Sequence, residues 1–271
     1  MSLTVPLQPD QDALRWDDHV DAYERVFEPL TTRFAAQTFD RLGPLAGRTL
    51  LDVAAGAGGA ALEAAARGAS TTAIDAAPAM VRRIAERDPA IAARVMDGNA
   101  LAFPDASFDI GFSGFGLILF PDPAAALAEL VRTIRPGGRI ALVAWTEPQH
   151  YALVGRLFAA ITSIRGAPPP PGPPPAQLRF VDPARFHALL AGAGLRDIRI
   201  ARLEADLVAP SAADLATSLD FAPGMAATLA AIGPDRVAVL QLFARSLTDD
   251  QGRGPVRLGA VAHAAFAVKP N

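Results

Sequence analysis

The stretch Leu50-Leu51-Asp52-Val53-Ala54-Ala55-Gly56-Ala57-Gly58-Gly59 decides the fold of this 271-residue chain. It is a short apolar run that contains an acid and leads into a glycine-rich loop. Such a run is typical of a buried parallel strand, and the glycines let the backbone pass close to a ligand. Asp75 ends the next apolar run, where a carboxylate can accept the hydroxyls of a ribose. The two features predict a nucleotide-binding loop at the carboxyl end of a parallel sheet.

The charge of Asp52 restricts the kind of nucleotide. Nicotinamide and flavin enzymes use similar glycine-rich loops, so the loop alone is weak evidence. Their loops direct a helix N-terminus at a pyrophosphate, and an acid at the strand end would repel that anion. S-adenosylmethionine carries cationic amino and sulfonium groups instead. Asp52 therefore favours S-adenosylmethionine as the ligand.

Strands and helices alternate around this loop. The predicted strands span residues 49–53, 70–75, 94–96, 108–113, 139–145, 198–203 and 256–268. Between them, residues 59–67, 78–87, 123–134 and 183–191 are predicted to be helices. This alternation builds a parallel sheet with helices on both faces.

The sequence resembles the class I S-adenosylmethionine-dependent methyltransferases, and among them the ubiquinone/menaquinone-biosynthesis (type 11) group. The resemblance runs from Leu50 to about Trp145 and more loosely to Leu203. Four motifs in order carry it: Asp52-x-Ala54-x-Gly56-x-Gly58, Met96-Asp97-Gly98-Asn99-Ala100-Leu101-Ala102-Phe103-Pro104, Ser107-Phe108-Asp109 and Arg135-Pro136-Gly137-Gly138. It implies an α/β fold with a Rossmann-like, seven-stranded, mostly parallel sheet in which residues 256–268 form an antiparallel last strand.

The same resemblance implies a set of cofactor-binding residues. They are Tyr23, Asp52, Ala54, Ala55, Gly56, Gly58, Asp75, Ala76, Met80, Asp97, Gly98, Asn99, Ser113 and Phe115. Asp97 matches the acid that contacts the adenine amino group. Met80 is also explained as a core residue of an amphipathic helix, and Tyr23 with Trp16 as core packing.

Ala54 departs from the family pattern, which usually has glycine at this position. If the backbone there has a positive φ, alanine is less favourable than glycine by about 1 kcal/mol. The alternative is an ordinary extended loop.

Three parts of the chain are predicted. Residues 1–45 form an N-terminal helical segment, with one or two amphipathic helices between residues 16 and 42. Residues 46–208 and 254–271 form the S-adenosylmethionine-binding domain, and residues 209–253 form a helical cap over the acceptor. The proline run 168–175 is interpreted as a stiff loop of a lid rather than a ligand for a proline-recognition module.

Methyl transfer from a sulfonium needs placement of the acceptor and exclusion of water, and a base only if the acceptor must lose a proton. His150 and Tyr151, just past the strand 139–145, are the candidate catalytic residues. Ser113-Gly114-Phe115-Gly116 differs from the Asn/Asp-Pro-Pro-aromatic motif of amino-methylating nucleic-acid enzymes. Metal-dependent catechol-type enzymes have an Asp after strand 4 and an Asp-Asn pair after strand 5. This chain has Ser113 and Trp145-Thr146-Glu147 there, so no metal site is predicted.

Composition restricts the partners. The net charge is −3, from 25 basic and 28 acidic residues, which argues against nucleic acid as substrate. The sequence has no cysteine. No apolar run approaches 18 residues and residues 1–12 do not resemble a leader, so a cytoplasmic, bacterial protein without membrane insertion is expected. Whether it forms a homo-oligomer is left open.

The function expected from the sequence is methyl transfer from S-adenosylmethionine to a carbon, oxygen or nitrogen of a small, largely apolar metabolite, without a metal. Phe115, Phe158, Phe180 and Phe221 are expected to favour such an acceptor. The alternatives are a non-catalytic S-adenosylmethionine-binding or regulatory protein and a nicotinamide-dependent oxidoreductase.

Overall fold

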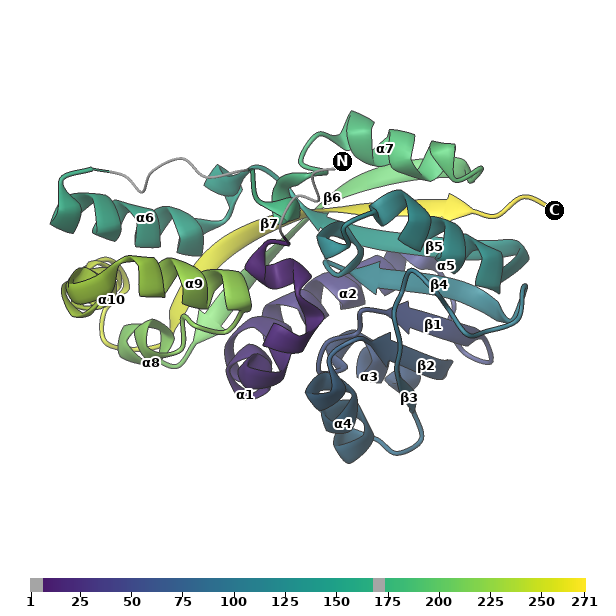
Figure 1. Cartoon of the computed structure of the whole chain (residues 1–271), viewed down its shortest axis with the longest axis horizontal. Coiled ribbons are helices and arrows are strands. Elements are labelled where there is room, and N and C mark those ends of the chain that lie inside the picture. The colour runs from purple at the N-terminus through teal and green to yellow at the C-terminus, as the bar shows by residue number, and fades with distance from the viewer. Residues whose placement is uncertain (1–6, 168–173) are drawn as a thin grey trace, which may run out of the picture.

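A seven-stranded sheet with the order β3-β2-β1-β4-β5-β7-β6 forms the centre of the molecule (Figure 1). The computed structural model describes residues 7–167 and 174–271, so most of the predicted proline loop lies outside the described residues. The strands are β1 (Thr49–Val53), β2 (Ser70–Asp75), β3 (Ala92–Val95), β4 (Phe108–Gly114), β5 (Ile134–Trp145), β6 (Arg196–Ala209) and β7 (Val256–Val268). β7 is antiparallel to both of its neighbours, β5 and β6. The predicted fold class is confirmed.

Helices cover both faces of the sheet. They are α1 (Val20–Ala22), α2 (Glu28–Leu42), α3 (Gly59–Ala66), α4 (Pro78–Arg87), α5 (Pro123–Thr133), α6 (Ala152–Arg165), α7 (Pro183–Gly192), α8 (Ala212–Thr217), α9 (Pro223–Ala231) and α10 (Arg236–Gln251). In Figure 1, α5 and α7 lie on one side of the sheet and α2 and α3 on the other. Leu50, Leu51 and Val53 are fully buried, as a strand covered on both faces requires. The ring of Phe39 on α2 packs 4.8 Å from that of Phe112 on β4.

Most of the predicted boundaries lie within two residues of those observed. The strand predicted at 94–96 is β3 at Ala92–Val95, and β5 begins at Ile134 rather than at 139. One helix was missed, because α6 lies between β5 and the proline run, where no helix was predicted. Its buried residues Leu153, Leu157 and Ile161 recur at i, i+4 and i+8, which is the signal that predicts a helix.

The distal halves of β6 and β7 form a ribbon that extends beyond the rest of the sheet. The pairing of β5 with β7 ends at Trp145 and Ala262, whereas the pairing of β6 with β7 continues to Ala209 and Val256. α8 follows the end of β6, and α10 precedes β7. These helices lie with α9 and α6 around the ribbon (Figure 1), and the four are called the cap below. In the described part of the chain, no single helix is long and apolar enough to cross a membrane.

The N-terminal segment, defined here as Pro9–Phe27, connects the cap to the sheet domain. It consists of two 3-10 turns (Pro9–Gln11 and Ala13–His19), α1 and a π-helical turn (Tyr23–Phe27), and it leads into α2. One carboxylate oxygen of Asp10 accepts a hydrogen bond of 2.6 Å from the Gly224 amide in the first turn of α9. The other accepts one from the Gln177 side chain. The predicted amphipathic helices are thus replaced, before Glu28, by short turns of different pitch.

Candidate functional site

Three acids form a row along one edge of the sheet. Asp52 lies in β1, Asp75 ends β2, and Asp97 follows β3 by two residues. These strands are neighbours and parallel, so the acids come from adjacent strands at their carboxyl ends. Neighbouring strands lie about 4.8 Å apart, so the row spans about 10 Å. It is long enough to contact several parts of one extended ligand.

The loop after β1 has the tight backbone that a close approach to a ligand requires. Ala54 has φ of 58°, so the extended-loop alternative at this position is wrong. Gly58 has φ of 96°, and a Cβ atom there would lie 2.8 Å from Cγ1 of Ile84. A side chain at residue 58 would therefore meet both backbone strain and a steric clash.

Asp52 is a buried acid without a full set of partners. It is 1% exposed, and its Oδ2 atom has no hydrogen-bond partner among the described residues. Burial raises the pKa of Asp52 well above its usual range, and the nearby charge of Asp75 raises it further. An unpaired buried carboxylate is unfavourable, so it favours a cationic ligand at this point.

Asp75 orders the loop from the neighbouring strand. Its carboxylate accepts hydrogen bonds of 2.9 Å from the backbone amides of Gly56 and Ala77. Burial raises the pKa of Asp75, although these amide hydrogen bonds act in the opposite direction. The same carboxylate that is predicted to bind a ribose thus also fixes the glycine-rich loop.

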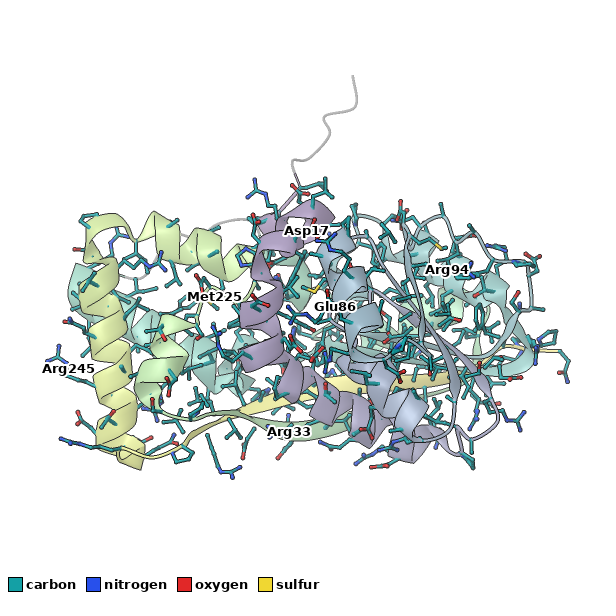
Figure 2. All side chains as sticks on the ribbon, turned by 90° about the horizontal axis from the view of Figure 1, so that it is seen from below. Asp17, Arg33, Glu86, Arg94, Met225 and Arg245 are labelled. Carbon is teal, nitrogen blue, oxygen red and sulfur yellow. The ribbon has the colours of Figure 1, made fainter. Side chains whose placement is uncertain are left out.

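Four acids fasten the N-terminal segment and the start of α2 to α4. Asp17, Asp21, Glu24 and Glu28 follow one another at intervals of four, three and four residues, which places them on one helical face. Figure 2 shows this part of the chain beside α4, with Asp17 and Glu86 labelled. The contacts that these four acids make with α4 and with the Gly59 amide are called the acidic latch.

The acidic latch pairs with successive turns of α4. Asp17 accepts a hydrogen bond of 2.7 Å from the Ala79 amide in the first turn of α4. Asp21 lies 2.6 Å from Arg83, and Glu24 also pairs with Arg83. Glu28, 5% exposed, lies 2.7 Å from Nη1 of Arg87, and its other oxygen accepts a hydrogen bond of 2.8 Å from the Gly59 amide. The last contact ties the latch to the first residue of α3.

The latch holds Tyr23 over the glycine-rich loop. A Cβ atom on Gly56 would lie 3.2 Å from the Tyr23 ring and hydroxyl, so the phenol directly covers this glycine. Tyr23, Asp52 and Ala54 line a small pocket of about 10 Å³, which is the size of about one water molecule. Ligand pockets for cofactors measure several hundred cubic ångströms. The Tyr23 ring therefore has to shift before a bulky group can lie directly against Gly56.

An aromatic cluster lies at the carboxyl ends of β4 and β5. Trp145 stacks on Phe115 with 4.0 Å between ring centroids and on Tyr151 with 5.1 Å. The ring centroid of Phe27, in the N-terminal segment, lies 5.8 Å from that of Trp145. Phe27 also stacks on Phe221, between α8 and α9, with 4.6 Å between ring centroids. Phe115 has φ of 62°, a strained backbone for a bulky residue. This cluster adjoins β1 on the side away from β2, next to the inner end of the acid row.

Comparison with known proteins agrees with this geometry. Residues 51–142 match the family described as a methyltransferase domain. The nocamycin O-methyltransferase of Saccharothrix syringae is 32% identical over 252 residues, which cover 85% of this chain and 87% of that protein. The chain belongs to the S-adenosylmethionine-dependent methyltransferases. The family expectation is thereby confirmed.

Other matches to methyltransferases are shorter or more distant. The demethylmenaquinone methyltransferase of Renibacterium salmoninarum is 33% identical over 52% of this chain. This chain spans 61% of that relative's length and 62% of the length of uncharacterized relatives from Mycobacterium tuberculosis. The phosphoethanolamine N-methyltransferase 2 structure from Haemonchus contortus has a TM-score of 0.57 at 18% identity, covering 99% of this chain and 61% of that one. The latter likeness is one of fold.

The cofactor of this methyltransferase family is S-adenosylmethionine, and the site fits it. The unpartnered oxygen of Asp52 is suited to a cationic group, a side chain added at Gly58 would clash with Ile84, and Asp75 ends the neighbouring strand β2 beside the loop. The predicted cofactor is confirmed for the family. Contact of Asp52, Asp75 and Asp97 with its amino acid, ribose and adenine parts stays a prediction.

The other predicted cofactor residues lie in different settings. Asp97 is exposed and accepts hydrogen bonds from Asn99, while Gly98 is buried beside Val53. Met80 is buried against Val20 and Ala57, as the core interpretation predicted. The remaining members stay near the loop or the strand ends: Ala55 donates to Ile74 of β2, Ala76 follows β2, and the Ser113 hydroxyl donates a hydrogen bond of 2.8 Å to the Val53 carbonyl. Their direct contact with the cofactor stays a prediction.

The two candidate catalytic residues separate in the structure. His150 Nδ1 lies 3.3 Å from the Thr146 hydroxyl and 3.1 Å from Glu147, so it is held by its own turn. Tyr151 instead stacks on Trp145, and burial raises the pKa of its phenol. A phenol with a raised pKa remains protonated, so Tyr151 is suited to donate a hydrogen bond rather than to act as a base.

Sequence reasoning missed several residues of the site. Glu28, Arg83 and Arg87 belong to the acidic latch. Trp145 and Phe27 belong to the aromatic cluster. The acid spacing from residue 17 to 28 is a signal that was available in the sequence. The phenylalanines that were expected to favour an apolar acceptor do not all lie together. Phe158 is exposed on α6, and Phe180 stacks on Phe186. Those two are not part of the cluster.

Proposed function

We propose that this protein transfers the methyl group of S-adenosylmethionine to a small, largely apolar metabolite without using a metal. The observation that carries the proposal is the aromatic cluster at the ends of β4 and β5, next to the acid row. Aromatic side chains bind flat apolar molecules and exclude water from them. The net charge of −3 favours a small acceptor over nucleic acid.

Metal independence is supported by the distribution of candidate ligands. Within residues 7–167 and 174–271, no three His, Asp or Glu side chains lie together as a metal site. When bound, S-adenosylmethionine supplies a methyl group on a cationic sulfur, already activated for attack by a nucleophilic atom. The protein then has to position the acceptor, hold the cofactor through the acid row and exclude water through the latch and the cap.

The test is calorimetric titration of the purified protein with S-adenosylhomocysteine. We expect binding, and Asp75→Ala should weaken it by about 10- to 150-fold, since a hydrogen bond to a charged group contributes about 1.5–3 kcal/mol. Asp249→Ala, at an exposed position of α10, is the matched control and should leave the affinity unchanged. Binding of NADH with none of the adenosyl ligand would contradict the proposal. Cofactor binding without turnover on any apolar acceptor would favour a non-catalytic role.

A further inference from the structure

A larger, open pocket lies at the end of the sheet opposite the acid row. Arg48 directly precedes β1, Asp109 is the second residue of β4, and residues 135–139 lie near the start of β5. These three strands are parallel, so the residues meet at the amino ends of the strands, whereas the acid row lies at carboxyl ends. The pocket that they line has a volume of about 290 Å³. Sites for small organic molecules begin at about this size, roughly 300 Å³.

An insertion in β5 forms one wall of this pocket. Along their shared ladder, β4 advances by two residues, from Phe108 to Ile110, while β5 advances by five, from Ile134 to Arg139. The extra residues of β5 leave the ladder, and bulges of this kind redirect side chains. The bulge thereby brings Arg135 and Arg139 into the lining of one pocket.

Positive charge exceeds negative charge in the lining. The charged residues there are Asp109 and three arginines, Arg48, Arg135 and Arg139. The Asp109 carboxylate is already paired, because one oxygen lies 2.8 Å from Nη1 of Arg135. The other oxygen accepts hydrogen bonds of 2.9 Å and 3.0 Å from the Thr49 amide and hydroxyl. Two of the arginines therefore face the pocket without a carboxylate of their own.

These two arginines, Arg48 and Arg139, are close enough to repel each other. The Arg139 guanidinium is fixed by hydrogen bonds of 2.6 Å and 2.8 Å to the carbonyls of Leu42 and Pro44, at the end of α2. Burial lowers the pKa of Arg139 and the charge of Arg48 lowers it further, although Asp109 acts in the opposite direction. Arg48 is exposed, and within residues 7–167 and 174–271 its side chain makes no hydrogen bond or ion pair. An anion between the two guanidinium groups would relieve their repulsion.

We propose that this pocket binds a phosphate monoester, with the phosphate between Arg48 and Arg139 and the organic part in the rest of the cavity. Guanidinium groups bind phosphate oxygens through paired N–H groups, and the two charges of the phosphate match the two arginines. The cavity also has room beyond the phosphate, since one water molecule needs only about 10–15 Å³. The pocket is separate from the acid row and the aromatic cluster, so its ligand does not depend on the proposed methyltransferase function.

The experiment is calorimetric titration with glycerol 3-phosphate at about pH 8 and low salt. The second pKa of a phosphate monoester is about 6, so the probe is a dianion, and low salt limits the screening of exposed charges. Glycerol and inorganic phosphate are titrated separately to test the two parts of the probe. Arg48→Gln removes one of the two arginines at an exposed position, and Arg82→Gln, at an exposed position of α4, is the matched control.

We expect one molecule of glycerol 3-phosphate to bind per chain, inorganic phosphate to bind more weakly, and glycerol not to bind. Arg48→Gln should weaken binding about three- to tenfold, and Arg82→Gln should leave it unchanged. No binding, or equal losses in the two variants, would overturn the site. Equal affinity for inorganic phosphate would overturn the role of the organic part. S-adenosylhomocysteine should not displace the probe, and displacement would place the probe in the cofactor site instead.

Discussion

Ala54 and Gly58 lie four residues apart in one loop, and both have a positive φ. At Gly58 the φ of 96° combines with the close approach of Ile84, whereas at Ala54 the φ of 58° falls in the small left-handed region open to other residues. These two conformations could not be distinguished from the sequence, because each depends on contacts with distant residues.

We expect opposite responses to substitution at these positions. Gly58→Ala should lower the free energy of unfolding by about 1–3 kcal/mol, because strain and overpacking add. Ala54→Gly should change it by less than about 1 kcal/mol, because relief of strain is offset by the greater freedom of glycine in the unfolded chain. Urea unfolding of both variants measures this. Equal losses at the two positions would show that the strain at Ala54 is negligible.

Asp52 links cofactor binding to pH. Burial and Asp75 raise its pKa, so the carboxyl group is more often protonated in the free protein. A cationic ligand favours the ionised form and lowers that pKa, so binding of S-adenosylmethionine should release protons. Affinity should then increase as the pH rises from the lowered pKa of the complex to the raised pKa of the free protein.

Calorimetry in two buffers of different ionisation enthalpy counts the released protons at a fixed pH. Asp52→Asn should bind more weakly and release fewer protons than the unsubstituted protein. Proton uptake on binding, or equal release by both proteins, would contradict a role for the Asp52 charge.

At the level of elements, local patterns predicted the regular parts of the fold and failed where distant contacts decide. β1, β2 and α4 were placed correctly because an apolar run or helical spacing defines each. β6 extends six residues past its predicted end, and the alternation of buried Leu203 and Leu207 with exposed Glu204 and Asp206 is a strand signal that was available in the sequence. The acid row was predicted because adjacent strands end together, whereas the latch joins residues about 60 positions apart.

The acidic latch should control access of the cofactor. Arg87→Gln leaves buried Glu28 without its cationic partner, and we expect a loss of about 2–3 kcal/mol in the free energy of unfolding. It should also accelerate association of S-adenosylmethionine, measured by stopped-flow tryptophan fluorescence, because the N-terminal segment opens more often. Sodium chloride should accelerate association in the unsubstituted protein by screening the outer pairs.

Arg82→Gln is the matched control for the latch. Arg82 is exposed on the same helix and forms no ion pair with any residue that the structure describes. The control should leave both the stability and the association rate unchanged. Identical rates for the two variants would mean that the segment opens independently of the latch.

For the molecule as a whole, we expect methyl transfer to be insensitive to chelators. The described residues hold no cluster of metal ligands, and the sulfonium donor is activated without one. Turnover measured with and without EDTA, on an apolar acceptor that the protein methylates, should agree within error. Loss of turnover that is restored by magnesium would contradict this expectation.

The ribbon formed by the distal halves of β6 and β7 has a consequence for how this chain can diversify. The helices of the cap are inserted after β5 or between the two strands of the ribbon, so their sequences can change without altering the register of the five strands from β3 to β5. Exchanging residues 152–165 and 210–255 together for those of a relative would therefore replace the cap and leave the acid row of β1, β2 and β3 in place. If methyl transfer then changes acceptor while S-adenosylmethionine affinity stays the same, the cap takes part in substrate choice, as we propose.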